Sequence, residues 1–261
     1  MRVVTIAFAL ALSVTTLAPS HAAGPNVIDL THAFDAETVY WPTEPGFDLK
    51  KLSAGFTDRG YFYAASRYDA PEHGGTHIDA PYHFAEHGQT VEQIPLDRLV
   101  GEAVCVDVTT PCSVDRDYLV TIDDLKQWEL ANNASLAEKI VLLRTGYAEH
   151  WPDRKKYLGT DEMGPAAVDK LHFPGLDPAA ASWLCSARRI KAVGIDTASI
   201  DNGPSRQFQS HVNLFERNTP ALENVASMKD LPATGFRVYA LPMKITGGTG
   251  APCRVVAELE N

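Results

Sequence analysis

The stretch EHGGTHIDAPYHFAEH, from Glu72 to His87, carries four of the nine histidines in this 261-residue chain, together with one aspartate. Only about half a histidine is expected in such a window from the overall composition. A lone histidine is more often a loop or surface residue than a ligand. This density instead favours a metal site. The residues concerned are His73, His77, Asp79, His83 and His87.

The spacing within this stretch favours a loop that leads into a short strand. A helix would place His73 and His77 on one face, but two glycines lie between them and a proline follows closely. On a strand, His77 and Asp79 project to the same side. The paired glycines allow the backbone to curl until His73 reaches the same point. Three ligands are therefore predicted to converge.

The residue types also restrict the metal. Imidazole and carboxylate groups without cysteine indicate Zn²⁺ or Mn²⁺, and the sequence does not choose between them. His83 follows a turn predicted at Asp79-Ala80-Pro81, so it is either a fourth ligand or a proton-transfer group beside the metal. His87 lies in a polar stretch and is predicted to be a solvated loop residue.

The run HGGTHIDAPYHF resembles the HxGTHxDxPxH signature of the cyclase-family metal-dependent hydrolases, which include bacterial kynurenine formamidases and isatin hydrolases. Further segments resemble the same family: VYWPTEP near the N-terminus, VGIDTASID, ALENV, and LPMKITGGTGAPCRVVA near the end. The resemblance extends over nearly all of the chain after its first residues. It implies an α/β protein with the swivelling β/β/α cyclase-type fold, in which peripheral helices surround a mixed, barrel-like β core.

The resemblance implies that His73, His77 and Asp79 are metal ligands and that His83 donates and accepts protons. In the formamidases, a second histidine and a glutamate twelve residues later complete a two-metal site. His211 and Glu223 have that separation in this chain. The predicted site therefore comprises six residues: His73, His77, Asp79, His83, His211 and Glu223.

Glu223 separates two branches of the family. Isatin hydrolases keep the first three ligands but lack the glutamate and hold one Mn²⁺, so Glu223 favours two ions per chain, Zn²⁺ or Mn²⁺. Without the resemblance, Glu223 would be interpreted as an exposed helix residue. The Tyr40-Trp41-Pro42 segment resembles the position where family members place an aromatic residue against the substrate. Trp41 is therefore predicted to bind substrate, with a core-filling role as the alternative.

The predicted function is hydrolysis of an amide C–N bond by metal-activated water, most like an arylformamidase acting on an N-formylkynurenine-type amide. A cyclic amide such as isatin is the alternative substrate. No GxSxG elbow is present to supply a serine nucleophile. An exported metal-binding protein or a non-catalytic ligand-binding protein is the alternative from another class. His83 argues against both, because metal storage gains little from a histidine that is not a ligand.

The first residues have a basic start, an apolar stretch and small residues before a cleavage point, which predicts a signal peptide over residues 1–22. Residues 24–261 are then predicted to form a single domain in the periplasm or outside the cell. No later segment is long enough to span a membrane. The formal charge of -10 without a basic stripe argues against nucleic acid as a partner. The resemblance implies a homodimer or homotetramer.

Four cysteines allow three disulfide pairings in an oxidising compartment, and the sequence does not choose among them. For Cys105, a buried free thiol explains the sequence as well as a disulfide does. Asp196 and Asp201 are interpreted as capping or turn residues outside the metal site, although both flank an apolar strand. The segment Gly247–Gly250 lacks the lysine of a phosphate loop and is interpreted as a tight turn.

Apolar runs predict short strands at 103–108, 139–144, 192–195 and 236–243. Two helices are predicted between them. The first, over 121–130, has Thr121 as its cap, two aspartates in its first turn and an apolar stripe on one face. The second, over 178–186, begins with Asp177 as cap and Pro178 at the first helical position.

Overall fold

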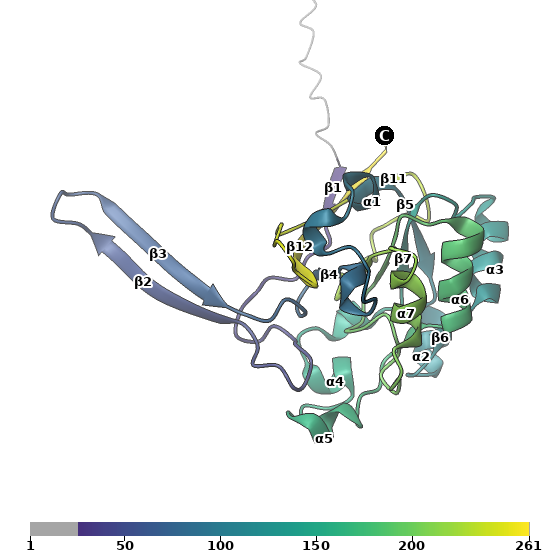
Figure 1. Cartoon of the computed structure of the whole chain (residues 1–261), viewed down its shortest axis with the longest axis horizontal. Coiled ribbons are helices and arrows are strands. Elements are labelled where there is room, and N and C mark those ends of the chain that lie inside the picture. Colours follow the sequence, from purple (N-terminus) through teal and green to yellow (C-terminus); the bar gives the residue numbers. More distant parts are fainter. Residues whose placement is uncertain (1–25, 261) are drawn as a thin grey trace, which may run out of the picture.

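Seven strands close into a mixed β-barrel at the centre of the molecule, with helices packed around it (Figure 1). The computed structural model describes residues 26–260. Around the barrel the strand order is β12, β11, β5, β7, β9, β10 and β4, and β4 pairs back onto β12 to close the ring. Strand β1 (Asn26–Asp29) is added outside the ring against β12. The predicted α/β fold with a barrel-like core is therefore confirmed.

The pairing changes direction around the barrel. Strands β5, β7, β9 and β10 run parallel to their neighbours in that series, and the remaining contacts of the ring are antiparallel. The bounds of the barrel strands are β4 His77–Asp79, β5 Val100–Asp107, β7 Ile140–Arg144, β9 Ala192–Ile195, β10 Ala221–Glu223, β11 Phe236–Pro242 and β12 Gly250–Leu259.

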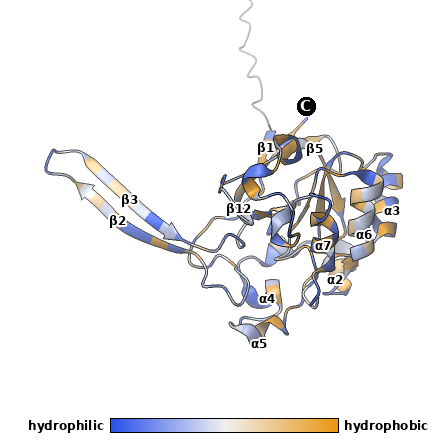
Figure 2. Cartoon of the chain, viewed as in Figure 1, coloured by the Kyte–Doolittle hydropathy of each residue, from blue (hydrophilic) through white to orange (hydrophobic). Residues whose placement is uncertain are grey.

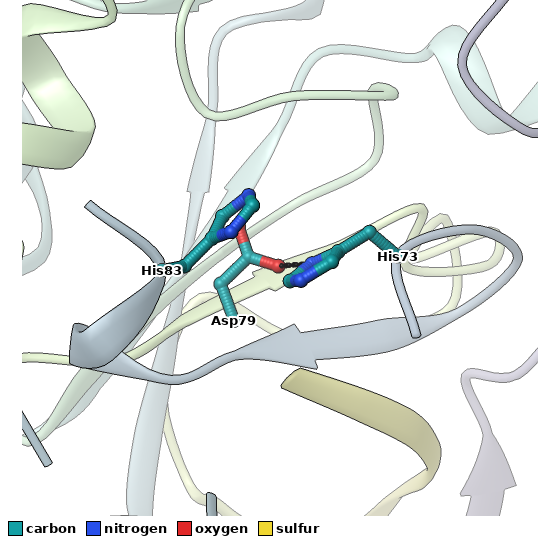
Figure 3. Close-up of side chains that lie close together, drawn as sticks. All are labelled: His73, Asp79 and His83. Carbon is teal, nitrogen blue, oxygen red and sulfur yellow. Dashed lines mark hydrogen bonds and ion pairs between the residues drawn. The ribbon is translucent and has the colours of Figure 1, made fainter. Parts of the chain in front are cut away.

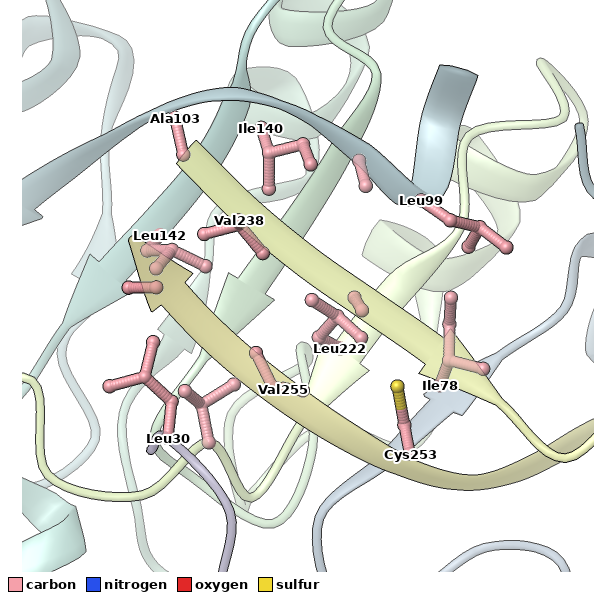
Figure 4. Packing of buried hydrophobic residues seen from close by; sticks show 14 of the residues in the cluster. Leu30, Ile78, Leu99, Ala103, Ile140, Leu142, Leu222, Val238, Cys253 and Val255 are labelled. Atoms are coloured by element: carbon pink, nitrogen blue, oxygen red, sulfur yellow. The ribbon is translucent and has the colours of Figure 1, made fainter. Parts of the chain in front are cut away.

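Alternation along the strands builds two hydrophobic layers. On β7, Ile140 and Leu142 join the cluster that fills the barrel (Figure 4), while Val141 and Leu143 join the cluster beneath the helices. Successive strand residues point to opposite faces of the sheet, so a strand covered on both sides is apolar throughout. This is why the parallel strands were recognisable as continuous apolar runs.

The helical segments lie around the barrel and in the loops, and α3, α6 and α7 cover one side of it (Figure 1). The α-helices are α1 Leu96–Leu99, α2 Thr109–Val114, α3 Ile122–Asn132, α4 Arg154–Leu158, α5 Pro165–Val168, α6 Pro178–Trp183 and α7 Gln209–Phe215. Shorter elements are the 3₁₀ helices η1 Pro81–His83, η2 Val91–Gln93 and η3 Tyr147–His150, the π-helix η4 Leu184–Arg188, and the paired strands β6 Leu119–Val120 and β8 Gly175–Leu176.

Both helices predicted from the sequence are present. Thr121 caps α3 and exchanges hydrogen bonds with Asp124, as its position predicted. Asp177 caps α6 through two backbone N–H groups. The second helix differs at its end, because α6 stops at Trp183 and continues as the π-helix η4. An ion pair between Arg188 and Glu129, with two contacts of 2.7 Å, ties this irregular turn to α3.

A long hairpin, which we call the arm, projects away from the barrel (Figure 1). It consists of β2 (Asp48–Phe56) and β3 (Phe62–Asp69). In register, Leu49 lies opposite Tyr68 and Phe56 opposite Phe62, and Ala54 and Ala64 pair between them. Polar and apolar stretches are both visible along the arm (Figure 2). The sequence pattern predicted no element in this region.

All four cysteines lie within the part of the chain that the structure describes, and none of them forms a disulfide. Burial raises the pKa of the Cys105 and Cys112 thiols to about 12, so both stay protonated at neutral pH. Across residues 26–260, no helix has both the length and the apolar character needed to cross a membrane. The predicted signal peptide, residues 1–22, lies outside the described residues.

Candidate metal centre and substrate cavity

The site is built where the barrel closes. Strand β4 is held between β10 and β12, with His77 opposite Glu223 on one side and opposite Pro252 on the other. Ile78 packs into the barrel interior, so His77 and Asp79 project from the opposite face of the strand. The same alternation on β10 turns Leu222 inward and brings Glu223 to the face of His77 and Asp79. Alternate residues of β4 and β10 therefore point either to the site or into the barrel core.

The two glycines before β4 adopt backbone conformations that disfavour side chains. Gly74 and Gly75 have φ of 156° and 57°. A Cβ at Gly74 would lie 2.1 Å from a ring carbon of Tyr40. This tight loop brings His73 beside the strand, with its Nδ1 2.7 Å from Oδ1 of Asp79 (Figure 3).

His77 is oriented by the backbone of the same loop. Its Nδ1 donates to the carbonyl oxygen of Gly75 at 2.9 Å, which leaves Nε2 as the ring nitrogen directed at the site. That Nε2 is buried and makes no hydrogen bond, although it lies 3.0 Å from Oδ1 of Asp79 and 3.6 Å from Oε2 of Glu223. The distance to Asp79 is short, but the geometry is not that of a hydrogen bond. A metal ion bound by this nitrogen and the two carboxylates would satisfy all three groups.

His211 has the same arrangement on α7. Its Nδ1 donates to Oδ2 of Asp201 at 2.6 Å, and its Nε2 faces Oδ2 of Asp79 at 3.1 Å and Oε1 of Glu223 at 3.0 Å. Asp201 also accepts the backbone N–H groups of Ser210 and His211. Asp201 thus caps the first turn of α7, in keeping with the capping role predicted for it. The same carboxylate also fixes the ring of His211, a role that no sequence pattern indicated.

Glu223 is a buried strand residue, only 4% exposed, and not the exposed helix residue that its local sequence suggests. Burial, and then the charge of Asp79, raise the pKa of Glu223. Burial also opposes ionisation of Asp79, but His73 and His77 outweigh it and hold the pKa of Asp79 well below its ordinary value. Two buried carboxylates this close need compensating positive charge.

The donor set fits a divalent metal. Ligand atoms of His77, Asp79 and Glu223 lie within 4.8 Å of one another, and so do those of a second group formed by His73, Asp79 and His83. Nitrogen and oxygen donors without a thiolate suit Zn²⁺ or Mn²⁺. Partners on the far ring nitrogens of His77 and His211 are the contacts that orient metal-bound histidines.

His83 lies on η1, directly above the ring of His73. The two rings are stacked with centroids 3.8 Å apart and an angle of 16° between their planes. Burial lowers the pKa of His83 to about 4, so its imidazole is neutral at neutral pH. The position beside Asp79 is compatible with both roles predicted from the sequence, a further ligand or a proton-transfer group (Figure 3).

A cavity of about 310 Å³ opens over these groups. Its wall is aromatic: Trp41 packs against Phe208, with ring centroids 6.2 Å apart, and Phe208 packs against Phe84 at 5.3 Å. Phe208 has a left-handed backbone, with φ of 48°, immediately before α7. Neither phenylalanine was identified from the sequence, because only the fold brings η1 and the start of α7 to Trp41.

The cavity contains every residue predicted for the site. His87 is exposed, as expected, and does not line the cavity. Asn224 also lines the cavity and was not predicted; its Oδ1 accepts a hydrogen bond from the buried Tyr157 hydroxyl at 2.9 Å. The predicted residues brought together here are Trp41, His73, His77, Asp79, His83, His211 and Glu223.

A closed mixed barrel that carries buried histidines and carboxylates beneath an aromatic cavity is the architecture of a metal-dependent hydrolase. The sequence profile of the Cyclase family matches residues 28–202, and the chain belongs to this family. The isatin hydrolase of Roseibium aggregatum is 31% identical over 90% of this chain and 88% of its own length. The kynurenine formamidase of Bacillus cytotoxicus is 26% identical over 88% of this chain and 95% of its own length.

Solved structures give the same result. Isatin hydrolase A from Labrenzia aggregata, bound to benzyl benzoate, superposes with a TM-score of 0.80 at 28% identity, covering 90% of this chain and 94% of that one. An isatin hydrolase bound to the product analogue thioisatinate gives the same TM-score over 93% of its chain. The family resemblance of the sequence is thereby confirmed.

Proposed function

We propose that this protein hydrolyses the amide C–N bond of a small aryl amide. One observation carries the proposal: imidazole nitrogens and buried carboxylates face one another at the base of a cavity walled by Trp41, Phe84 and Phe208. Aromatic side chains favour a flat aromatic substrate, because rings pack against rings with little loss of entropy. The relatives named isatin hydrolase and kynurenine formamidase support the same chemistry.

We assign His73, His77, Asp79, His211 and Glu223 as the residues that would hold the metal, with two ions per chain. The bound metal, Zn²⁺ or Mn²⁺, supplies a water of lowered pKa and polarises the amide carbonyl. Support for two ions comes from Asp79, whose Oδ1 faces His73 while its Oδ2 faces His211.

His83 is assigned the proton transfer. Its neutral imidazole accepts a proton from the attacking water, whose oxygen bonds to the carbonyl carbon. The same ring then returns the proton to the leaving nitrogen as the C–N bond breaks, so that the products are a carboxylic acid and an amine. Trp41 and Phe208 hold the aromatic ring of the substrate during this step.

Two kinds of aryl amide fit this chemistry. Glu223 favours an open-chain aryl formamide, of the type that the relatives named kynurenine formamidase act on. A cyclic amide is the second candidate, favoured by the TM-score of 0.80 to an isatin hydrolase bound to thioisatinate. In either case the scissile bond joins a carbonyl carbon to a nitrogen on an aromatic ring.

The test is a hydrolysis screen of the purified protein loaded with Zn²⁺ or Mn²⁺, using N-formylkynurenine, formanilide, isatin and a lactone as ester control. We expect turnover of at least one aryl amide that is abolished by a chelator and restored by metal. Preferential turnover of isatin would select the second candidate. Tight metal binding without turnover of any amide would instead favour an exported metal-binding or ligand-binding protein.

The second ion has its own test. Wild-type protein saturated with Zn²⁺ should carry close to two equivalents by elemental analysis, and Glu223→Ala should carry close to one, because His211 loses its carboxylate partner. Glu149→Ala is a control, since Glu149 lies outside the cavity. One equivalent in the saturated wild-type protein would refute the two-ion assignment.

We also propose that the protein is exported and acts as a homodimer. Export rests on the predicted signal peptide. The dimer rests on the arm, one face of which carries Leu49, Phe56, Phe62 and Tyr68, each at least half exposed. A two-stranded hairpin is marginally stable alone in water, and an apolar stripe on it favours contact with another surface.

A further inference from the structure

The turn Gly247–Gly250 has a place in the metal centre that its sequence did not reveal. The Thr249 hydroxyl oxygen lies 2.8 Å from Nε2 of His73 and 2.6 Å from Oε2 of Glu72. The backbone N–H of Thr249 donates to the same carboxylate oxygen at 2.9 Å. These contacts form a continuous chain of hydrogen bonds from Glu72 through Thr249 and His73 to Asp79.

The direction of the hydrogen bonds follows from the available hydrogens. The hydroxyl of Thr249 donates its single hydrogen to Oε2 of Glu72, which also accepts the Thr249 backbone N–H. The oxygen of Thr249 then accepts a hydrogen bond from Nε2–H of His73. When Thr249 holds the hydrogen on Nε2, Nδ1 is the ring nitrogen left to bind a metal, and it lies 2.7 Å from Oδ1 of Asp79.

The shape of the turn supports this role. A Cβ at Gly250 would lie 2.6 Å from Cε1 of His73, and a Cβ at Gly248 would lie 2.9 Å from Oε1 of Glu72. Both glycines therefore allow the turn to pack against the residues that it orients. The carbonyl oxygen of Thr249 also accepts the N–H of Ala80 at 2.8 Å, which fixes the turn to the end of β4.

We propose that Glu72 and Thr249 are positioning residues that hold His73 as an Nδ1 ligand of the metal. His77 and His211 present Nε2 instead, because Gly75 and Asp201 bond their Nδ1 atoms. The centre would thus combine one Nδ1-bound and two Nε2-bound histidines. This inference rests on the proposed metal centre and adds to it the segment Gly247–Gly250.

The experiment measures metal affinity and the tautomer of His73. Thr249→Val keeps the shape of the side chain and removes the hydroxyl, whereas Thr249→Ser keeps the hydroxyl. Competition with a chromophoric chelator should show Zn²⁺ affinity lowered about 10-fold or more in Thr249→Val and in Glu72→Gln, with Thr249→Ser close to wild type. In the Zn²⁺-loaded protein, ¹⁵N NMR should show Nδ1 of His73 bound to metal and Nε2 protonated.

Thr109→Val is the matched control. Thr109 donates both its hydroxyl and its N–H to one oxygen of Asp107, at 2.7 and 2.9 Å, but contacts no histidine. Its replacement should leave Zn²⁺ affinity unchanged. Wild-type affinity in Thr249→Val, or metal bound to Nε2 of His73, would overturn the inference and leave the proposed function intact. Failure of the wild-type protein to bind any divalent metal would overturn both.

Discussion

His77 and His211 show how single side chains are prepared for a metal. Each donates one ring N–H to the protein and turns the other nitrogen toward Asp79 and Glu223. Contacts with the protein therefore fix the orientation of both rings. Such preparation lowers the entropy lost on metal binding.

At His83, one substitution separates the two roles that its position allows. We expect His83→Ala to retain its metal and to lose turnover by about 10²- to 10⁴-fold, because the proton acceptor is removed. Elemental analysis gives the metal content, and initial rates on the best aryl amide give the activity. His87→Ala, which changes an exposed histidine four residues later, should retain both. Loss of metal together with activity would show that His83 is a ligand.

His32 predicts a pH dependence of stability. Its ring is stacked on Trp151 with centroids 4.0 Å apart, and burial lowers its pKa to about 4 from 6.5. Above pH 6.5 the ring is neutral in both the folded and the unfolded protein. Between pH 6.5 and 4 only the unfolded protein gains the proton, so stability falls as the pH falls through this window.

The expected loss from His32 is about 2 kcal/mol, after allowance for its partial exposure to solvent. Urea unfolding at pH 7.5 and pH 4.5 measures it, with His32→Phe as the comparison because phenylalanine keeps the stack on Trp151. The variant should lose less stability over this interval than the wild type. An equal loss in both proteins would show that His32 is not the group responsible.

How far the residues of the site could be predicted depends on their distance in the chain. Spacing alone indicated His73, His77 and Asp79, because all three lie within seven residues. His211 and Glu223 were reached only through the family resemblance. Thr249 and Asp201 were not assigned to the site at all, because a hydroxyl or carboxylate is identified as a histidine partner only when the fold brings the two together.

Among the elements, four barrel strands, β5, β7, β9 and β11, and the two capped helices followed from the sequence. The run at 192–195 coincides with β9, and Thr121 begins α3 as expected. The arm could not be predicted from the sequence. Both of its faces are exposed, which removes the alternation of buried and exposed residues that identifies a half-buried strand. Its turn signal, Gly60 with φ of 82° between the two strands, was the available indication.

The arm carries a prediction about assembly. Phe56 and Phe62 pair across its tip and are 79% and 60% exposed. In a homodimer that buries them, replacing both by threonine removes four phenylalanines from the interface and should weaken dimerisation about a millionfold, since each buried phenylalanine contributes roughly 2 kcal/mol. Sedimentation velocity over a range of concentrations measures the change.

The opposite face of the arm provides the control. Lys50 and Arg67 pair across it and are also exposed. Replacing this pair by threonine should leave the dimer unchanged, because the contact proposed here involves the apolar face. A dimer that survives Phe56→Thr/Phe62→Thr at the wild-type concentration, or a wild-type protein that is monomeric throughout, would argue against the arm as the dimer contact.

At the scale of the whole molecule, the sequence indicated the class of fold but not the order of the strands. Apolar runs show which segments are buried, and they contain no information on which neighbours pair. The closure of the ring depends on β4, a three-residue strand too short to show periodicity, which contacts β10 and β12 from much later in the chain. The barrel itself was therefore reached through the resemblance and not from the pattern of elements.

The position of β4 has a consequence for folding. Its partners are separated from it by more than a hundred residues, so the ring closes only after most of the chain has been made. Such long-range pairing is slow to form. Because the proposed ligands come from β4 and the loop before it, from β10 and from α7, an open ring offers no complete site, and metal would bind only the closed form. The rate of metal uptake during refolding would then report the rate at which the barrel closes.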